Sequence, residues 1–294
     1  MLWPKNLDKN IKPGVKLASY TTFKIGGAAR FFFEPDTLQE LRDALIFARA
    51  KRIPVFILGA GSNILASDTG LNALVIRLSG KDFKGLAVNG VHLQAGSGLK
   101  ISRLLTAAKK RSLSGLEFLA GIPGTLGGGL MGNAGAWGKS IGDMVEEVSV
   151  LDYNGKAKLL KKSRLEFGYR RSNLGKYIIT GAKLKLTPGK PSQISSLIRG
   201  LLKQRSLSQE NNLPSAGCVF KNPTALWPAG KLIEACGLKG RAAGGAVISP
   251  VHANFILNRG RAKSKDVLSL MRLSAKEVEK KFKVKLEPEI KIWK

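Results

Sequence analysis

The most informative stretch of the sequence is Ala120-Gly-Ile-Pro-Gly-Thr-Leu-Gly-Gly-Gly-Leu-Met-Gly-Asn-Ala-Gly-Ala-Trp-Gly138. It contains eight glycines, one proline and no charged residue. Ordering so many glycines costs conformational entropy, which is worthwhile where the backbone must approach another group closely. Backbone N–H groups outside helices and sheets form concave donor sites that suit phosphates. The stretch therefore predicts a loop that binds a flavin or nucleotide pyrophosphate. Tight turns between packed strands are the alternative reading.

Two common nucleotide-binding motifs are absent. A Walker loop ending at Gly138-Lys139-Ser140 requires a glycine five residues before Gly138, where the sequence has Asn133. A dinucleotide fingerprint starting at Gly59 requires a small residue at position 64, where the sequence has Ile64. The sequence thus favours neither a P-loop NTPase nor a Rossmann enzyme.

Composition indicates a folded protein with an unusual charge. The 294 residues suffice for two or three domains, and 44% of them are hydrophobic. Lys and Arg number 49 against 20 Asp and Glu, which gives a net charge of +29. The basic residues are spread along the chain, so we interpret them as a solvated surface that attracts anionic ligands. A basic nucleic-acid-binding protein is the rival from another class, although no recognition helix or zinc finger is evident.

The cellular setting is inferred from segments that are absent. Cys218 and Cys236 have no zinc or CxxC spacing, which indicates a reducing compartment and no metal site, with a single disulfide between them as the alternative. The start of the chain lacks the apolar core of a signal peptide, and no apolar run is long enough to span a membrane. We expect a cytoplasmic protein, a monomer, with no membrane or nucleic-acid partner.

Hydrophobic periodicity predicts an α+β fold. Residues 37–52 and 99–111 have the spacing of amphipathic helices, and residues 54–58 read as a buried strand. The Asn154-Gly155 turn between two apolar runs predicts a hairpin. Further strands are expected at 218–220 and 286–293, and a helix at 264–282. We expect a first domain over residues 1–188, split near 80–90, and a second over residues 189–294.

Eight short motifs occur in the same order as in a known enzyme family. They are Thr22-Phe-Lys-Ile-Gly-Gly-Ala-Ala29, Leu58-Gly-Ala-Gly-Ser-Asn-Ile-Leu65, Gly121-Ile-Pro-Gly-Thr-Leu-Gly-Gly128 with Asn133-Ala-Gly135, Phe167-Gly-Tyr-Arg170, Gly217-Cys-Val-Phe-Lys-Asn-Pro223, Ala229-Gly-Lys-Leu-Ile-Glu234, His252-Ala-Asn-Phe-Ile256 and Leu286-Glu-Pro-Glu289. Through them the chain resembles the UDP-N-acetylenolpyruvoylglucosamine reductases, flavoenzymes of bacterial peptidoglycan precursor synthesis. The resemblance extends from about residue 20 to the last strand.

This resemblance implies a fold, two cofactors and a reaction. It implies an FAD-binding domain of the vanillyl-alcohol-oxidase (PCMH) type, in two α+β subdomains, followed by an α+β substrate-binding domain. It also implies non-covalent FAD, NADPH as the reductant and UDP-N-acetylmuramate as the product. Arg170 and Cys218 are only 48 positions apart, so the chain resembles the shorter subgroup without a tyrosine-bearing lid.

The resemblance assigns the FAD contacts to two loops. The residues expected to bind FAD are Gly59, Ala60, Gly61, Ser62, Asn63, Leu65, Gly121, Ile122, Pro123, Gly124, Gly128, Asn133, Ala134 and Gly135. For Ser62 and Asn63, simple turn capping is the alternative. An oxidase of the same fold that uses oxygen and another substrate is the nearest rival. Neither His92 nor His252 lies in a glycine loop, so a covalent flavin link is not indicated.

The implied chemistry predicts three catalytic residues. Hydride addition to the enolpyruvyl group leaves negative charge beside the substrate carboxylate, and a fixed cation such as Arg170 would stabilise that charge. Cys218 stands where the family commonly has a proton-donating serine, and it donates either directly or through water. A buried structural role is the alternative for Cys218. The family motif assigns the third role to Glu289 rather than Glu287.

The substrate itself is expected to contact four further residues. Tyr169 belongs to the Phe-Gly-Tyr-Arg motif, and Lys221 and Asn222 are expected near the diphosphate or sugar. Lys291 stands where the family frequently has an arginine. We expect His252 to have a structural role.

Overall fold

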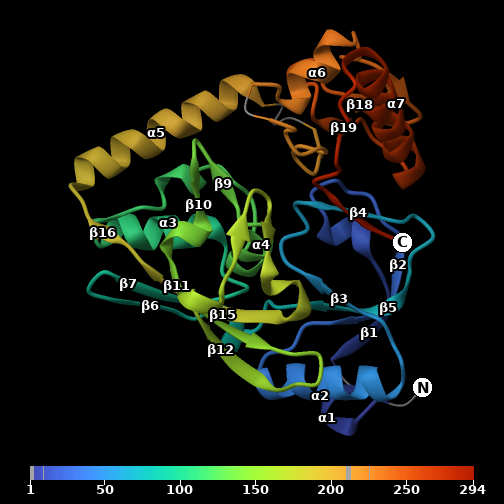
Figure 1. The fold of residues 1–294 in the computed structure, drawn as a ribbon. Helices are drawn as coiled ribbons and strands as arrows, with labels where there is room; N and C mark the ends of the chain where they lie inside the picture. The colour runs from blue at the N-terminus through green and yellow to red at the C-terminus, as the bar shows by residue number, and fades with distance from the viewer. Residues whose placement is uncertain (1–2, 9, 210–212, 225) are drawn as a thin grey trace. The chain divides into compact units, whose positions relative to one another are not determined.

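A computed structural model describes residues 3–8, 10–209, 213–224 and 226–294, as a chain of mixed helices and strands (Figure 1). The α-helices are α1 (Lys5–Asp8), α2 (Leu38–Ala50), α3 (Ile101–Lys110), α4 (Leu126–Met131), α5 (Pro191–Ser208), α6 (Ala229–Ala235) and α7 (Ser264–Phe282). The longer strands are β1 (Ile11–Lys16), β2 (Ala28–Phe33), β3 (Val55–Leu58), β5 (Leu71–Arg77), β6 (Leu86–Asn89), β7 (His92–Gly96), β11 (Val145–Leu151), β12 (Ala157–Lys161) and β15 (Ile178–Lys185). The shorter strands are β4 (Ile64–Ala66), β8 (Leu113–Ser114), β9 (Gly135–Ala136), β10 (Lys139–Ser140), β13 (Phe167–Gly168), β14 (Arg171–Ser172), β16 (Thr187–Pro188), β17 (Ala242–Ala243), β18 (Ala246–Ile248), β19 (Ile256–Asn258) and β20 (Lys291–Trp293).

Backbone proximity divides the chain into two compact units that are discontinuous in sequence. Unit 1 comprises residues 1–13, 31–60 and 72–204, and unit 2 comprises residues 14–30, 61–71 and 205–294. The segment 61–71 belongs to unit 2 because β4 pairs in parallel with β20, at the other end of the chain. The expected domains, residues 1–188 and 189–294, are continuous in sequence, and they stay a prediction.

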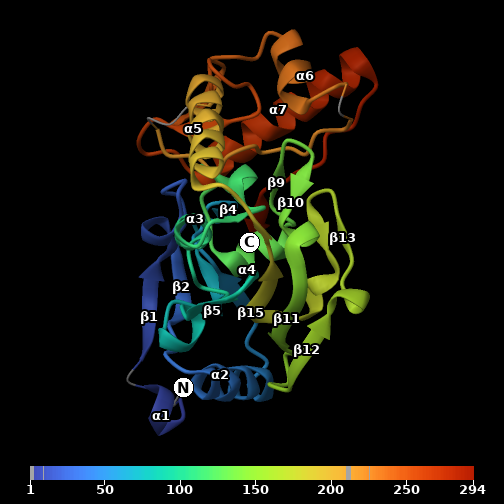
Figure 2. The ribbon, with the colours of Figure 1, turned by 90° about the vertical axis from the view of Figure 1, so that its left-hand side faces the viewer.

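The largest sheet of unit 1 is antiparallel, in the order β12-β11-β15-β7-β6. Figure 2 shows β11, β12 and β15 beside one another. The predicted hairpin is confirmed, since β11 and β12 pair and Gly155 in their turn has a φ of +80°. One face of the sheet is apolar and shares a core with α3, α4 and the residues that precede α4.

A second sheet has the order β1-β2-β5-β3, and its β3 and β5 run parallel. The predicted helix at 37–52 is confirmed as α2, which begins with a capping box between Thr37 and Glu40. Leu41, Leu45 and neighbouring alanines of α2 are buried in one core with apolar residues of β2 and β5. Figure 1 shows α2 beside the strands of this sheet.

In unit 2, α6 and α7 share a core with the small sheet β17-β18-β19. The predicted helix 264–282 is confirmed as α7, and the Asp68 carboxylate accepts hydrogen bonds from the N–H (2.6 Å) and hydroxyl (2.7 Å) of Ser264 at its start.

Two predicted strands are shorter than expected. Residues 218–220 pair with their neighbours only through single bridges, and the final strand begins at Lys291 rather than at residue 286. Pro288 lies in the part of the expected strand that does not form, and it has no N–H to donate to a β-ladder. Within the described residues, no helix is both long enough and apolar enough to cross a membrane.

Candidate active site

The long glycine segment folds into a turn, a one-and-a-half-turn helix and a hairpin within unit 1. Gly121 (φ +77°) and Gly124 (φ +151°) adopt backbone conformations that side chains disfavour. Thr125 then caps α4, and its hydroxyl accepts a hydrogen bond from the Gly128 N–H at 3.4 Å. The glycines therefore serve a specific backbone path rather than a flexible linker.

Close packing around this path excludes side chains at several positions. A Cβ atom on Gly59 would lie 2.8 Å from the Thr125 hydroxyl, and one on Gly127 would lie 2.9 Å from the Ser97 Cβ. Among the described residues, no protein atom accepts a hydrogen bond from the N–H of Gly59, Gly121 or Gly124. Backbone N–H groups that no described residue accepts from, on a glycine-rich path, are the kind of donor that a pyrophosphate requires. The residues present therefore fit FAD.

The other predicted FAD residues of unit 1 differ in their surroundings. Ile122 and Ala134 are half-buried against the apolar core of this unit, and Gly128 has space beside its Cα. Pro123 precedes the left-handed Gly124, and Ala60 is half-buried after the end of β3. Some of the residues predicted to bind FAD therefore pack against the core, as Ile122 and Ala134 do, whereas Gly128 has open space beside its backbone.

Asn133 lies buried at a left-handed position (φ +44°) and connects two hairpins. Its side-chain amide donates to the Gly168 carbonyl at 3.0 Å, and its side-chain oxygen accepts from the Gly142 N–H at 3.0 Å. Both polar atoms of its side chain therefore brace protein backbone.

Arg170 occupies the second position of the two-residue turn between β13 and β14. Its φ of +54° is uncommon for a non-glycine residue, and such strain is concentrated at functional sites. One terminal nitrogen of its guanidinium donates to the carbonyl of Gly135 at 3.1 Å. Its guanidinium carbon also lies 5.7 Å from the centre of the Tyr169 ring, which is 56% exposed. The predicted catalytic arginine is therefore tied directly to the end of the glycine loop.

Unit 2 contains the later part of the predicted FAD loop that begins at Gly59, from Gly61 onward. Gly61 (φ +67°) packs so tightly that a Cβ atom would meet the Tyr20 carbonyl oxygen at 2.0 Å. Ser62 is half-buried, and the Asn63 side-chain amide donates to the carbonyl of Glu289 at 3.3 Å. Leu65 is fully buried in the core of the unit. This loop therefore contacts the segment that carries a predicted catalytic carboxylate.

The segments that carry Cys218 and Glu289 lie beside each other in unit 2. The Glu289 N–H donates to the Val219 carbonyl at 2.8 Å, and Phe220 forms a bridge with Pro288. On its other side the Cys218 segment forms a bridge with Phe255. The thiol-bearing segment is thus held between two neighbours by backbone pairing.

The remaining predicted substrate residues extend from the same segments. Lys221 forms an ion pair with Glu287 at 3.0 Å, so Glu287 is engaged through its side chain. The Asn222 side-chain oxygen accepts from the N–H of Ala229 at 3.1 Å, at the start of α6. Lys291 donates its N–H to the Asn63 carbonyl at 2.9 Å, and its side chain is exposed.

Asn254 is a supporting residue that sequence reasoning missed. It is 1% exposed, its side-chain oxygen accepts from the Phe220 N–H at 3.0 Å, and its amide donates to the Phe220 carbonyl at 2.8 Å. It therefore acts like a pairing strand for the segment after Cys218. An asparagine inside the apolar motif His252-Ala-Asn-Phe-Ile256 was the available signal, because buried amides need partners.

His252 has the surroundings of a structural residue. Its Nδ1 accepts a hydrogen bond from the Asn254 N–H at 3.2 Å, and its ring lies 4.8 Å from that of Phe255. Burial, with a smaller contribution from the charge of Lys239, lowers the pKa of His252 below 6.5. A neutral ring suits the acceptor role of Nδ1.

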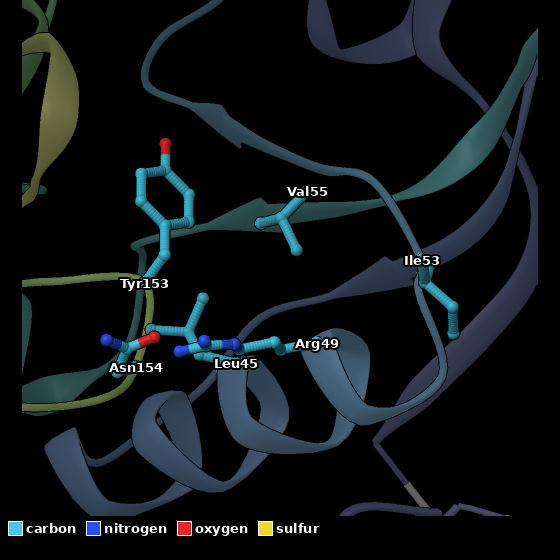
Figure 3. A pocket seen from close by; sticks show the side chains of 6 residues that line it. All are labelled: Leu45, Arg49, Ile53, Val55, Tyr153 and Asn154. Carbon is cyan, nitrogen blue, oxygen red and sulfur yellow. The ribbon is translucent and has the colours of Figure 1, made fainter.

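A separate pocket of about 310 Å³ lies in unit 1, lined by Leu45, Arg49, Ile53, Val55, Tyr153 and Asn154. Figure 3 shows the Arg49 side chain extending toward Asn154, with the Tyr153 ring above them. Burial raises the pKa of Tyr153, so its hydroxyl is un-ionised at neutral pH. None of the predicted site residues lines this pocket. Over the described residues, no cluster of side chains suitable for a metal ion occurs.

Comparison with known proteins matches the two parts of the chain separately. Residues 29–160 match the FAD binding domain family, and residues 208–293 match the C-terminal domain of UDP-N-acetylenolpyruvoylglucosamine reductase. The reductase of that name from Synechococcus sp. (strain JA-3-3Ab) is 46% identical, over 97% of this chain and 92% of the relative. The reductase from Clostridioides difficile (strain 630) is 40% identical, over 97% of this chain and 93% of the relative.

The chain belongs to the UDP-N-acetylenolpyruvoylglucosamine reductase family. A solved structure from this family, that of Thermus caldophilus, is 36% identical, covers 97% of this chain and 99% of its own, and has a TM-score of 0.83. Cholesterol oxidase from B. sterolicum shares the fold alone, with 16% identity and a TM-score of 0.50 over 63% of this chain and 38% of that one.

Family membership confirms the resemblance stated from the eight motifs. It also confirms the predicted fold class, an FAD-binding domain of the PCMH type combined with an α+β C-terminal domain. FAD is the cofactor of the matched N-terminal domain, so the chain is a flavoprotein of the oxidoreductase class.

Proposed function

We propose that the protein reduces the enolpyruvyl ether of UDP-N-acetylglucosamine to UDP-N-acetylmuramate with electrons from NADPH. The relatives named above are reductases of the enolpyruvyl sugar nucleotide. The observation that carries the proposal is the hydrogen bond between Arg170 and Gly135, because it attaches a fixed cation to the end of the candidate flavin cradle. When bound, FAD would supply the hydride-transfer chemistry that links NADPH to the substrate.

The first task of the protein residues is to stabilise charge on the substrate. Hydride addition at the terminal vinyl carbon places negative charge on the carboxylate side of the enolpyruvyl group. Arg170 stabilises that charge with its cationic guanidinium, whose planar fork of N–H donors matches a carboxylate. Because its backbone and one nitrogen are already fixed, little reorganisation accompanies the reaction.

The second task is to deliver a proton to the carbon beside the carboxylate. The S–H proton of Cys218 can be transferred to that carbon, directly or through water, which leaves a thiolate on Cys218. The neighbouring Glu289 carboxylate orients the reacting group, and the backbone pairing between the two segments sets their spacing. The exposed Lys291 and the paired Lys221 present positive charge to the diphosphate of the sugar nucleotide. Tyr169 and Asn222 complete the proposed substrate contacts.

The backbone N–H groups of Gly59, Gly121 and Gly124 would hold the FAD pyrophosphate. We also propose that the enzyme works as a monomer in the cytoplasm, where a reducing environment would keep Cys218 and Cys236 as thiols.

Two measurements test the proposal. The visible spectrum of the purified protein should show oxidised flavin, and NADPH consumption should depend on the enolpyruvyl sugar nucleotide. Oxygen-dependent NADPH or substrate oxidation without that sugar would instead support a same-fold oxidase. Tight, steeply salt-dependent nucleic-acid binding by protein that lacks flavin would reject both alternatives.

A further inference from the structure

Two adjacent apolar side chains are exposed in the segment before α6. Leu226 is 85% exposed and Trp227 is 54% exposed, both within unit 2. Single exposed apolar residues are ordinary, but a neighbouring leucine and tryptophan at one loop tip form a concentrated apolar surface. Neither residue belongs to the proposed catalytic or substrate-binding set, so the reductase reaction does not account for them.

Trp227 is held in place by two contacts within the unit. The Thr224 hydroxyl accepts a hydrogen bond from the Trp227 N–H at 3.0 Å. The Trp227 ring centre lies 6.2 Å from that of Phe282, the last residue of α7. The exposed apolar tip is therefore attached to the C-terminal end of the longest helix of this unit.

That end of α7 is strongly basic. Exposed lysines occupy positions 276, 280, 281, 283 and 285, against glutamates only at 277 and 279. The Lys281 ammonium lies 5.5 Å from the centre of the Phe282 ring, the ring that Trp227 contacts. Apolar and cationic side chains therefore meet at one edge of the unit.

We propose that Leu226, Trp227 and the lysines at the end of α7 form a docking edge for the anionic surface of a phospholipid membrane. Tryptophan prefers the membrane interface, a leucine can enter the acyl boundary, and lysines attract anionic headgroups. A nucleic acid fits less well, because the most exposed residue of the tip is an aliphatic side chain without a face for base stacking. The sequence-based expectation of no membrane partner rested on the lack of a spanning segment, which peripheral docking does not require.

Vesicle sedimentation of the full-length, FAD-loaded protein tests this edge. Wild-type protein should sediment with vesicles of phosphatidylcholine and phosphatidylglycerol, and hardly at all with vesicles of phosphatidylcholine alone. The double variant Leu226→Ser/Trp227→Ser keeps every charge and should bind the anionic vesicles about tenfold more weakly. Lys280→Gln/Lys283→Gln should weaken binding about fivefold for each charge removed.

Matched controls separate the edge from the general charge of +29. Lys109→Gln/Lys110→Gln removes the same charge from α3 in unit 1, and Leu159→Ser removes a leucine with 54% exposure from β12. Both control variants should bind like the wild type. Trp227→Phe should also abolish the blue shift of tryptophan fluorescence on vesicle binding.

Three results would overturn the proposal. The first is no binding to anionic vesicles, and the second is equal binding by the Leu226/Trp227 variant, which would mean diffuse electrostatic attraction. The third is a Leu226→Ser/Trp227→Ser variant that binds anionic vesicles like the wild type but binds RNA more weakly or has a raised KM for the sugar nucleotide. That result would assign the tip to those ligands. Each result can be read whether or not the proposed reductase activity is found, because vesicle binding is measured without turnover.

Discussion

The two sets of proposed catalytic residues are held in place by different kinds of structure. Arg170 in unit 1 sits in a strained hairpin turn and is fixed by a bond from its own side chain to the glycine loop. Cys218 and Glu289 in unit 2 lie on extended segments that are fixed by backbone pairing. A change of side chain should therefore disturb the surroundings more at Arg170 than at Cys218.

In both units, the residues proposed to take part in the reaction differ from the residues that hold them in place. In unit 2 the support comes from neighbours such as Asn254, whose amide holds both polar groups of the Phe220 backbone. In unit 1 Asn133 gives the same kind of support between Gly168 and Gly142. Activity lost at a supporting residue should be accompanied by lost stability, whereas activity lost at Cys218 should not.

The largest effect is expected from Gly61→Val, which attacks backbone packing in unit 2. The new Cβ atom would lie 2.0 Å from the Tyr20 carbonyl oxygen, at a φ of +67° that valine disfavours. We expect a loss of about 3 kcal/mol or more of unfolding free energy, and protein with little FAD. Urea unfolding and the ratio of flavin to protein absorbance measure the two effects.

Gly240→Val is the matched control for this substitution. Gly240 has a similar φ of +75°, but no atom lies within 4 Å of the position of its Cβ. It should lose only the cost of the strained backbone, about 1–3 kcal/mol, and should keep its flavin. Equal losses in the two variants would show that strain rather than close packing explains the glycine at position 61. The glycine loop of residues 120–138 can be tested in the same way. Gly124→Val should also lower the FAD content, because valine disfavours the φ of +151° at this position.

The next largest effect is expected from Arg170→Ala, through the chemistry of unit 1. Reduction of the flavin by NADPH should be spared, because the arginine acts on charge that appears only on the enolpyruvyl substrate. Reoxidation by that substrate should slow about 10²–10³-fold, as for the loss of one charge-stabilising donor. Stopped-flow absorbance at the flavin band measures the two half-reactions separately.

Arg171→Ala is the control, since it removes an exposed neighbouring arginine from β14. It should leave both half-reactions unchanged. Equal slowing of both half-reactions in Arg170→Ala would show that Arg170 supports the flavin loop through Gly135 rather than stabilising the substrate. Its role would then resemble that of Asn133.

The sequence was sufficient for the parts of this site that depend on local signals. The glycine loop, the Asn154-Gly155 hairpin and the helices α2, α3 and α7 follow from backbone freedom and periodicity, and all occur in the structure. The parallel pairing of β4 with β20 could not be predicted, because no local pattern links residues 64–66 with residues 291–293. Neither could the bonds of the Asn133 and Asn254 side chains, since the sequence shows an amide but not its partners.

A smaller effect is expected at Cys218. Which of its serine and alanine variants is more active distinguishes the two possible roles of the thiol. If the thiol donates the proton, Cys218→Ser should retain activity, and Cys218→Ala should slow only the reoxidation by substrate. If Cys218 is a small apolar packing residue, alanine should be mild and serine worse, through an unpaired hydroxyl. Substrate-driven flavin reoxidation and urea unfolding of both variants decide between the two orders. A Cys218→Ala variant as fast as the wild type would remove the thiol from the mechanism.

The smallest expected effect concerns His252, whose ring helps to hold the segment that pairs with Cys218. Burial lowers the pKa of His252 in the folded protein below the 6.5 of an exposed histidine, so the unfolded chain binds the proton more readily. Stability from this group is therefore fully present above pH 6.5. It declines as the pH falls from 6.5 toward the lower folded value, and it stays lost below that value. Protonation would also remove the Nδ1 acceptor used by the Asn254 N–H, so the decline should begin near the Cys218 segment.

Urea unfolding of the wild type and of His252→Gln across this pH range isolates the contribution, because every other titrating group is shared by the two proteins. The variant should show a shallower dependence on pH. Parallel curves for the two proteins would mean that His252 titrates alike in both states and does not contribute to the pH dependence of unit 2.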